Sequence, residues 1–158
     1  MADSHLVSTP LDPNVKLIKL LDMEHYNIPD YRSAISSLMY AAIGTRPDIS
    51  FAVQHLSQFM SNLAPAHWTA VKLVFRYLNG TRSLGITYHK GGEVKPLAYS
   101  DADWGSNIND RKSISGYMFQ MSAGPISWQS KKQPTIALSS MEAEYMAESL
   151  ATQQIIWL

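Results

Sequence analysis

The stretch LAYSDADWG, residues 97–105, reads as a strand but carries two aspartates two positions apart. Side chains of a strand point to opposite faces in turn, so Asp101 and Asp103 would share one face, with Ser100 and Ala102 on the other. From spacing alone the pair has two interpretations. It is either the solvated end of a strand or part of a site for a hard cation such as magnesium, which needs one or two protein carboxylates.

A helical segment is expected before this strand. Apolar residues recur at spacings of three and four, which predicts three amphipathic helices, at residues 30–44, 48–60 and 65–79. Asp30 and Asp48 stand at the positions of N-caps, Pro65 opens the third helix, and Gly80 is placed to end it. Residues 1–29 show no such pattern and predict an extended lead-in.

Short strands are expected around the central one. The β-rich residues 84–88, followed by a Gly91–Gly92 turn, predict a hairpin with residues 97–103. Two further strands are predicted at residues 116–121 and 125–128. The whole chain is therefore predicted to be of the α/β (α+β) class, and we expect the apolar stripe of the third helix, which includes Val71 and Val74, to pack its helical part against its strands.

Composition limits the function classes. The 158 residues, 46% of them hydrophobic, can bury a core for one domain or one and a half. Lys plus Arg balances Asp plus Glu, 13 against 13, so no global basic field would attract nucleic acid or an anionic membrane. The absence of cysteine excludes disulfides, Cys-ligated zinc and thiol catalysis. No signal peptide or apolar span is evident, which predicts an intracellular protein without a membrane partner.

A final helix is predicted from Ser139, which has capping-box spacing to Glu142. Glu142 and Glu144 are two residues apart and point to nearly opposite sides of a helix, so only one of them can share a site with Asp101. Capping explains Glu142, which makes Glu144 the better functional candidate. Glu148 shares the face of Glu144 and is interpreted as a solvated surface residue.

Five segments in order carry a family resemblance. They are YRSAISSLMYAAIGTRPDISFAV (31–53), HWTAVKLVFRYLNGTRSLGITY (67–88), YSDADWG (99–105), DRKSISGY (110–117) and ISWQSKKQPTIALSSMEAEYMA (126–147). The chain resembles, from about residue 9 to residue 158, the C-terminal part of the Pol polyprotein of Ty1/copia-type LTR retrotransposons. Copia-like frames of this length also resemble candidate RxLR effectors of plant-pathogenic oomycetes.

The resemblance implies a division of the chain into an extended lead-in (1–29), a three-helix connection segment (30–80) and a partial ribonuclease H-like domain (81–158). The TRPD region, Arg46 to Asp48 with the preceding threonine, is interpreted as structural. In the ribonuclease H-like part, a mixed sheet with one helix is expected to stop before the fourth core strand.

The resemblance also implies a metal site. Asp101 matches the first metal-binding aspartate and Glu144 the metal-binding glutamate, with Asp103 a possible third ligand. These are the expected catalytic residues of a two-metal-ion hydrolysis, with Mg²⁺ or Mn²⁺, of the RNA strand of an RNA–DNA hybrid. A third and a fourth acidic ligand would follow Leu158 in a complete domain.

Four basic residues are candidates for contact with the nucleic-acid backbone: Arg111, Lys112, Lys131 and Lys132. For the lysine pair at 131 and 132, a solvated turn is the alternative interpretation.

Three function classes remain open. The first is a Pol-derived fragment with an incomplete ribonuclease H site, inactive alone, and the second is an active ribonuclease H. The third is a non-enzymatic secreted RxLR-type effector of a plant-pathogenic oomycete, which would act on host plant proteins inside the host cell. The nearest approach to an Arg-x-Leu-Arg motif, after which the third class is named, is the run RYLN, residues 76–79, within a predicted helix.

Overall fold

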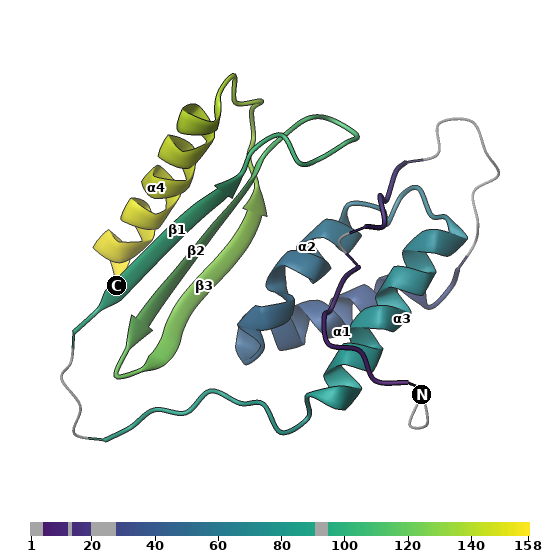
Figure 1. The fold of residues 1–158 in the computed structure, drawn as a ribbon, viewed down its shortest axis with the longest axis horizontal. Helices are drawn as coiled ribbons and strands as arrows, with labels where there is room; N and C mark the ends of the chain where they lie inside the picture. The colour runs from purple at the N-terminus through teal and green to yellow at the C-terminus, as the bar shows by residue number, and fades with distance from the viewer. Residues whose placement is uncertain (1–4, 13, 20–27, 91–94) are drawn as a thin grey trace. The chain divides into compact units, whose positions relative to one another are not determined.

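The computed structural model describes residues 5–12, 14–19, 28–90 and 95–158, and the chain forms two compact units, Met1–Gly85 and Ile86–Leu158 (Figure 1). No helix in the described ranges is long and apolar enough to cross a membrane. The assignment of lead-in, connection and ribonuclease H-like segments stays a prediction.

The first unit contains the three predicted helices. They are α1 (Tyr31–Gly44), α2 (Ser50–Ser57) and α3 (Pro65–Gly80), and a short 3₁₀ helix, η1 (Pro47–Ile49), precedes α2. The middle helix is shorter than predicted, because its first turn is 3₁₀ and the chain turns after Ser57. Asp30 occupies the N-cap position of α1 as predicted, but its side chain makes no capping hydrogen bond; its backbone carbonyl accepts from Ala34 N at 2.8 Å.

A single apolar core holds this unit together. It includes residues of all three helices and Leu17 of the lead-in, which is 5% exposed. The side chain of Tyr31 is buried in this core, and its hydroxyl donates a hydrogen bond to the backbone carbonyl of Leu56 in α2 at 2.8 Å. Val71 and Val74 are fully buried in the same core. The expectation that their stripe packs against the strands was therefore wrong, because the helical unit uses it internally.

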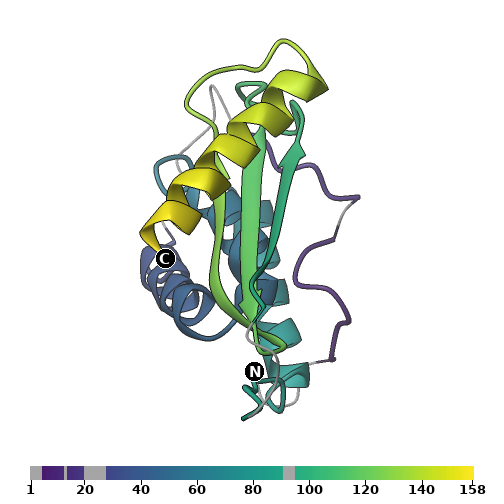
Figure 2. The ribbon, with the colours of Figure 1, turned by 90° about the vertical axis from the view of Figure 1, so that its left-hand side faces the viewer.

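The second unit is a sheet covered by one helix. Its strands are β1 (Leu97–Asp103), β2 (Ile114–Met121) and β3 (Gly124–Lys132), in the order β1-β2-β3, and every pairing is antiparallel. The helix α4 (Ser140–Trp157) packs over β1 and β2 and buries three alanines, Ala143, Ala147 and Ala151 (Figure 2). The predicted α/β class is confirmed. The described strands are all antiparallel, so the mixed sheet implied by the resemblance stays a prediction.

The strand predicted at residues 84–88 is absent from the described part of the chain, and its Gly91–Gly92 turn lies outside the described residues. Tyr88 instead packs through its side chain. Its hydroxyl donates to the carbonyl of Pro125 at 2.6 Å, and its ring lies on Gly124, where a Cβ would come within 2.7 Å of it. The tyrosine that suggested β structure is thus a contact to the β2–β3 hairpin rather than part of a ladder.

The loop between β2 and β3 is a two-residue turn with unusual residues. Ser122 and Ala123 have φ of 51° and 66°, and Met121 pairs with Gly124 across it. Positive φ at both central residues defines a type I′ turn, which normally carries Asn-Gly. The turn therefore holds two L-residues in the left-handed region, where a Cβ is unfavourable.

Replacing Ala123 by glycine is expected to stabilise the second unit by about 1 kcal/mol, because glycine adopts this conformation without the Cβ penalty. Hydrogen exchange of the β2 amides measures the change. Ala98→Gly in β1 is the matched control and is expected to destabilise by about 0.5–1 kcal/mol. Equal destabilisation by both substitutions would contradict the turn assignment.

Candidate functional site

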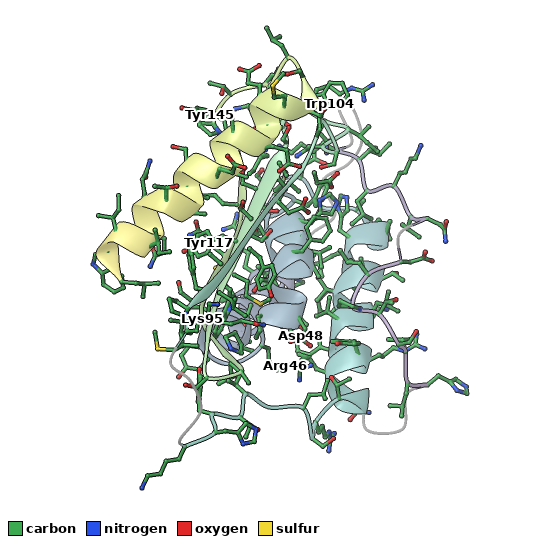
Figure 3. The ribbon with its side chains drawn as sticks, turned by 60° about the vertical axis from the view of Figure 1, so that its left-hand side comes forward. Arg46, Asp48, Lys95, Trp104, Tyr117 and Tyr145 are labelled. Atoms are coloured by element: carbon green, nitrogen blue, oxygen red, sulfur yellow. The ribbon has the colours of Figure 1, made fainter. Side chains whose placement is uncertain are left out.

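The end of β1 and the start of α4 lie at the same end of the sheet. The indole Nε1 of Trp104, directly after β1, donates to the carbonyl of Ala137 at 3.1 Å, three residues before α4 begins. Figure 3 shows Trp104 beside this end of the helix. Trp104 is 53% exposed, so this hydrogen bond lies at the surface of the unit.

Gln133 fixes the first turn of α4 over the sheet. Its side-chain Nε2 donates to the hydroxyl of Ser115 on β2 and to the carbonyl of Ala143, both at 2.9 Å. Ser115 is paired with Ala102 on β1. The carbonyl of Ala143, the residue before Glu144, is thus linked through Gln133 to Ser115, whose cross-strand partner lies between the two aspartates.

The register also defines the faces. Ser115 lies on the face that α4 covers, and its cross-strand partner Ala102 shares that face. Alternation places Asp101 and Asp103 on the other side of the strand, and both are exposed. Glu144 is half-buried. The strand predicted from LAYSDADWG and the shared face of its aspartates are confirmed, whereas the close approach of Glu144 to Asp101 stays a prediction.

The start of α4 is capped as its sequence predicts. The hydroxyl of Ser139 accepts a hydrogen bond from the backbone N–H of Glu142 at 3.1 Å. The Glu142 carboxylate accepts in return from the backbone N–H of Leu138 at 2.7 Å. Capping thus accounts for Glu142 and leaves Glu144 and the exposed Glu148 as the other carboxylates of the helix.

The donor atoms are of the right kind for magnesium, but their number is small. Carboxylate oxygens are the ligands that Mg²⁺ and Mn²⁺ prefer. Among residues 5–12, 14–19, 28–90 and 95–158, however, no three His, Cys, Asp or Glu side chains are grouped so that they could hold a metal ion. The described residues therefore do not form a complete metal cage.

The four basic candidates differ in their partners. Lys132 forms an ion pair with Asp110 at 2.7 Å, and Lys112 donates to the carbonyl of Pro134 at 2.5 Å. Burial is the largest single effect on the pKa of Asp110 and raises it, but the hydrogen bonds from Lys132 and from the Lys112 backbone, together with the charges of both lysines, outweigh it and hold that pKa below its ordinary value. Arg111 and Lys131 are exposed. A nucleic-acid contact by any of the four stays a prediction.

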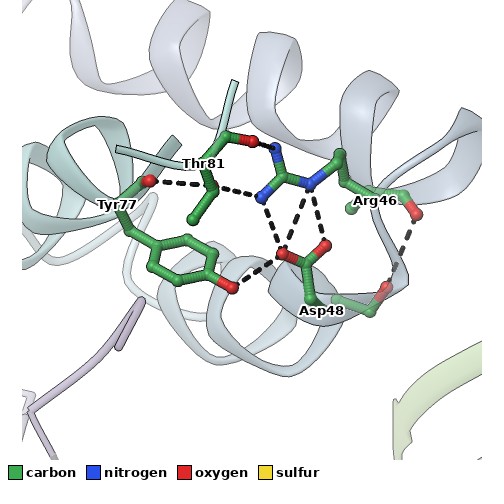
Figure 4. Close-up of polar contacts among 6 residues, drawn as sticks. Arg46, Asp48, Tyr77 and Thr81 are labelled. Carbon is green, nitrogen blue, oxygen red and sulfur yellow. Dashed lines mark hydrogen bonds and ion pairs between the residues drawn. The ribbon is translucent and has the colours of Figure 1, made fainter. Parts of the chain in front are cut away.

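A second polar cluster lies in the helical unit, within the TRPD region (Figure 4). The Arg46 guanidinium binds both carboxylate oxygens of Asp48, at 2.9 and 2.7 Å, and also the carbonyl and hydroxyl of Thr81. The Tyr77 hydroxyl donates to Asp48 at 2.9 Å. The cluster ties the start of η1 to the end of α3, which supports the structural interpretation. Asp48 is therefore an ion-pair partner and not the helix cap predicted from its position.

Sequence reasoning missed Gln133. The residue follows β3 within the polar run SKKQPT, where nothing in the pattern marks one polar residue as 4% exposed and bonded to two elements. Its burial depends on contacts with Ser115 and Ala143, which are 18 and 10 residues away.

The comparisons with known proteins give the family. No family model and no solved structure matches the chain. A protein of Plasmopara viticola named secreted RxLR effector protein 161 is 50% identical, over 84% of this chain and 92% of its own length. The Pol polyprotein of transposon TNT 1-94 of Nicotiana tabacum is 43% identical over 100% of this chain, and that of transposon RE2 of Arabidopsis thaliana is 41% identical over 96%. The chain spans only 12% and 10% of these two polyproteins. The chain belongs to one family with the RxLR-named protein of P. viticola and is homologous to the Pol polyproteins of copia-type retrotransposons.

Proposed function

We propose that this Pol-derived chain carries part of a ribonuclease H site, with Asp101 and Glu144 as metal ligands and Asp103 as a possible third. The 158 residues by themselves do not cleave RNA–DNA hybrids. The observation that supports the site is the position of Ala143, which Gln133 holds over the partner of Ala102. Glu144 is thereby near the strand level of Ala102, on the face opposite Asp101 and Asp103, so a shared metal site would have to form around the edge of β1.

The proposed inactivity follows from charge. Two divalent cations a few ångströms apart repel strongly, and a two-metal site offsets this repulsion with several carboxylates. Asp101, Asp103 and Glu144 supply at most three, and two of them are exposed. The hybrid would be bound through its phosphates and 2′-hydroxyls, for which the exposed Arg111 and Lys131 are the available cations.

Hybrid cleavage tests the proposal. The purified chain is expected to show no Mg²⁺- or Mn²⁺-dependent cleavage above that of Asp101→Asn, measured on a labelled RNA–DNA hybrid. A chain extended with the following segment of a Pol relative is expected to cleave, and to lose at least about 100-fold of its rate on Asp101→Asn or Glu144→Gln, since each removes a ligand.

Asp30→Asn, at an exposed carboxylate of the helical unit, is the matched control and should leave the rate of the extended chain unchanged. Cleavage by the unextended chain that Asp101→Asn abolishes would refute the inactivity. An extended chain that cleaves equally well with Glu144→Gln would refute the ligand assignment.

A second candidate rests on the P. viticola relative. This chain covers 92% of a protein named as a secreted RxLR effector, which favours a non-enzymatic role in a host plant cell, through host proteins. Quantitative mass spectrometry of the culture medium and cell extract of the producing organism tests it. Enrichment of the chain in the medium supports secretion, and confinement to the cells refutes it.

A further inference from the structure

The surface of α3 carries positive charge that no acidic residue of its own segment balances, although the chain as a whole is neutral. No Asp or Glu occurs between Asp48 and Glu93, a run that contains four Lys or Arg residues and the whole of α3. A surface that carries one sign of charge attracts ligands of the opposite sign. The surface of α3 is therefore a candidate contact for an anionic partner.

Three of these cations follow one side of α3. Lys72 and Arg76 are four residues apart, and helical spacing puts them on the same face of the helix. Asn79 continues this face, and the Arg82 guanidinium, just past the helix, donates a hydrogen bond to its Oδ1. We call Lys72, Arg76 and Arg82 the basic ridge. At the rise of an α-helix, it extends over about 15 Å.

The cations of the basic ridge are not neutralised within the described part of the chain. No carboxylate there forms an ion pair with any of the three. Lys72 and Arg82 are exposed, and Arg76 is half-buried. The Nε of Arg76 donates to the carbonyl of His5 at 2.7 Å, which fixes this guanidinium on the surface of α3. All three charges can therefore pair with anions of a partner.

The surroundings of the ridge argue against a membrane and against a protein as that partner. Binding to an anionic membrane requires large apolar side chains that enter the interface beside the cations. A protein partner requires an apolar contact at the centre of its interface. None of the exposed large apolar residues in the described ranges belongs to α3.

The length and the polar neighbours of the ridge fit a nucleic-acid strand. A duplex carries one phosphate per about 3.4 Å of its axis on each strand, so about four phosphates of one strand lie along about 15 Å. Thr69 and Asn79 lie on the same face of α3 as Lys72. Thr and Asn side chains are among those that contact phosphate and sugar.

We propose that the basic ridge binds the sugar–phosphate backbone of a nucleic acid without sequence preference. Lys72 and Arg82 bind phosphates as exposed cations, and Arg76 offers its terminal Nη groups to a third phosphate. The ridge belongs to the helical unit, whereas Arg111 and Lys131 belong to the second unit. This inference does not depend on metal ions or on the proposed hydrolysis.

Fluorescence anisotropy with a short labelled DNA duplex tests the proposal, in EDTA so that no divalent ion contributes. The full chain is expected to bind with a Kd of about 1–100 μM. Three phosphate contacts predict that the logarithm of the affinity falls with the logarithm of the salt concentration, with a slope of about −2.7. A duplex of the same length and another sequence should bind equally well, because phosphates carry no sequence information.

Lys72→Gln with Arg82→Gln is expected to weaken binding at least about 10-fold at low salt and to reduce the salt slope by about 2, since it removes two phosphate contacts. Arg32→Gln with Lys95→Gln is the matched control. It removes the same charge at exposed sites outside the ridge and should change the affinity less than about 2-fold. Circular dichroism checks that both double variants fold.

Equal weakening by the two double variants would overturn the proposal, because overall charge would then explain binding. A loss on Arg111→Gln with Lys131→Gln that the ridge variant does not share would place the contact in the second unit instead. Equal affinity for a polyglutamate peptide, or tighter binding to phosphatidylserine vesicles than to the duplex, would identify another class of partner. No detectable binding of the duplex at low salt would refute the contact outright.

Discussion

Replacing His67 by alanine is expected to lower the free energy of unfolding of the helical unit by about 3 kcal/mol, from lost packing and two lost hydrogen bonds. His67 is 1% exposed and stacks on Phe59 with 4.0 Å between ring centroids. Its Nδ1 accepts from the backbone N–H of Ala64 at 3.0 Å, which caps the start of α3. Its Nε2 lies 3.1 Å from the carbonyl of Ile18 and must donate, because a carbonyl only accepts.

The neutral Nε2–H form of His67 therefore joins the lead-in to α3. His67→Phe keeps a ring on Phe59 and separates packing from hydrogen bonding, with an expected loss of about 2 kcal/mol. Native-state hydrogen exchange of the α3 amides is the measurement, because a single midpoint would mix two units. His5→Ala, at an exposed histidine, is the control. A loss below about 0.5 kcal/mol for His67→Ala would contradict this role.

His67 should also make the helical unit sensitive to acid. Burial lowers its pKa below the ordinary value of 6.5; the bond to Ile18 opposes this shift, and the nearby His55 adds to it. The unfolded chain therefore binds a proton at a higher pH than the folded unit does. By linkage, the contribution of His67 is present above about pH 6.5 and is lost as the pH falls from there through the lower folded pKa. His67→Phe should reduce this dependence.

The sequence predicts regular elements well where one local period persists. Spacings of three and four placed α1 and α3 close to their observed bounds, and alternation placed β1. Residues 84–88 are richer in β-favouring residues than β1 but form no strand, because a strand also requires a partner edge. Tyr88 instead forms a side-chain hydrogen bond to the carbonyl of Pro125. No local sequence pattern distinguishes a residue that pairs in a strand from one that makes such a contact.

Polar contacts across long sequence separations were the part that could not be predicted. His67 lies four residues before Val71, so helical spacing puts it on the buried face, but its bond to Ile18 spans 49 residues. Gln133 is similar, since its position depends on Ser115 and Ala143. For the candidate site, the sequence was enough to identify the carboxylates and to predict that Asp101 and Asp103 share one face of their strand. The placement of α4 over β1 required the fold.

Asp48→Asn is expected to destabilise the helical unit by about 2 kcal/mol, because it leaves the Arg46 guanidinium, 12% exposed in its side chain, without its ion pair. Burial alone would raise the pKa of Asp48, but hydrogen bonds from Arg46 and Tyr77 outweigh it and hold the pKa below its ordinary value of 3.8. The contribution is therefore present above about pH 3.8 and is lost as the pH falls through the lower folded pKa.

Asp110→Asn is the matched control, because its ion pair with Lys132 has the same 2.7 Å length but the two side chains are 36% and 27% exposed. Exposed pairs contribute little, so its loss should stay below about 1 kcal/mol in the second unit. Hydrogen exchange of each unit's own core amides gives both values from one experiment. If the two substitutions cost the same, or if the effect of Asp48→Asn persists unchanged at pH 2, the Arg46–Asp48 pair does not stabilise the junction of η1 and α3. The opposite outcome is a loss of unfolding free energy that is larger for Asp48→Asn than for Asp110→Asn and that disappears in acid. It would show that partial burial and the hydrogen bonds from Tyr77 and Arg46, rather than the ion-pair distance, set the strength of this interaction.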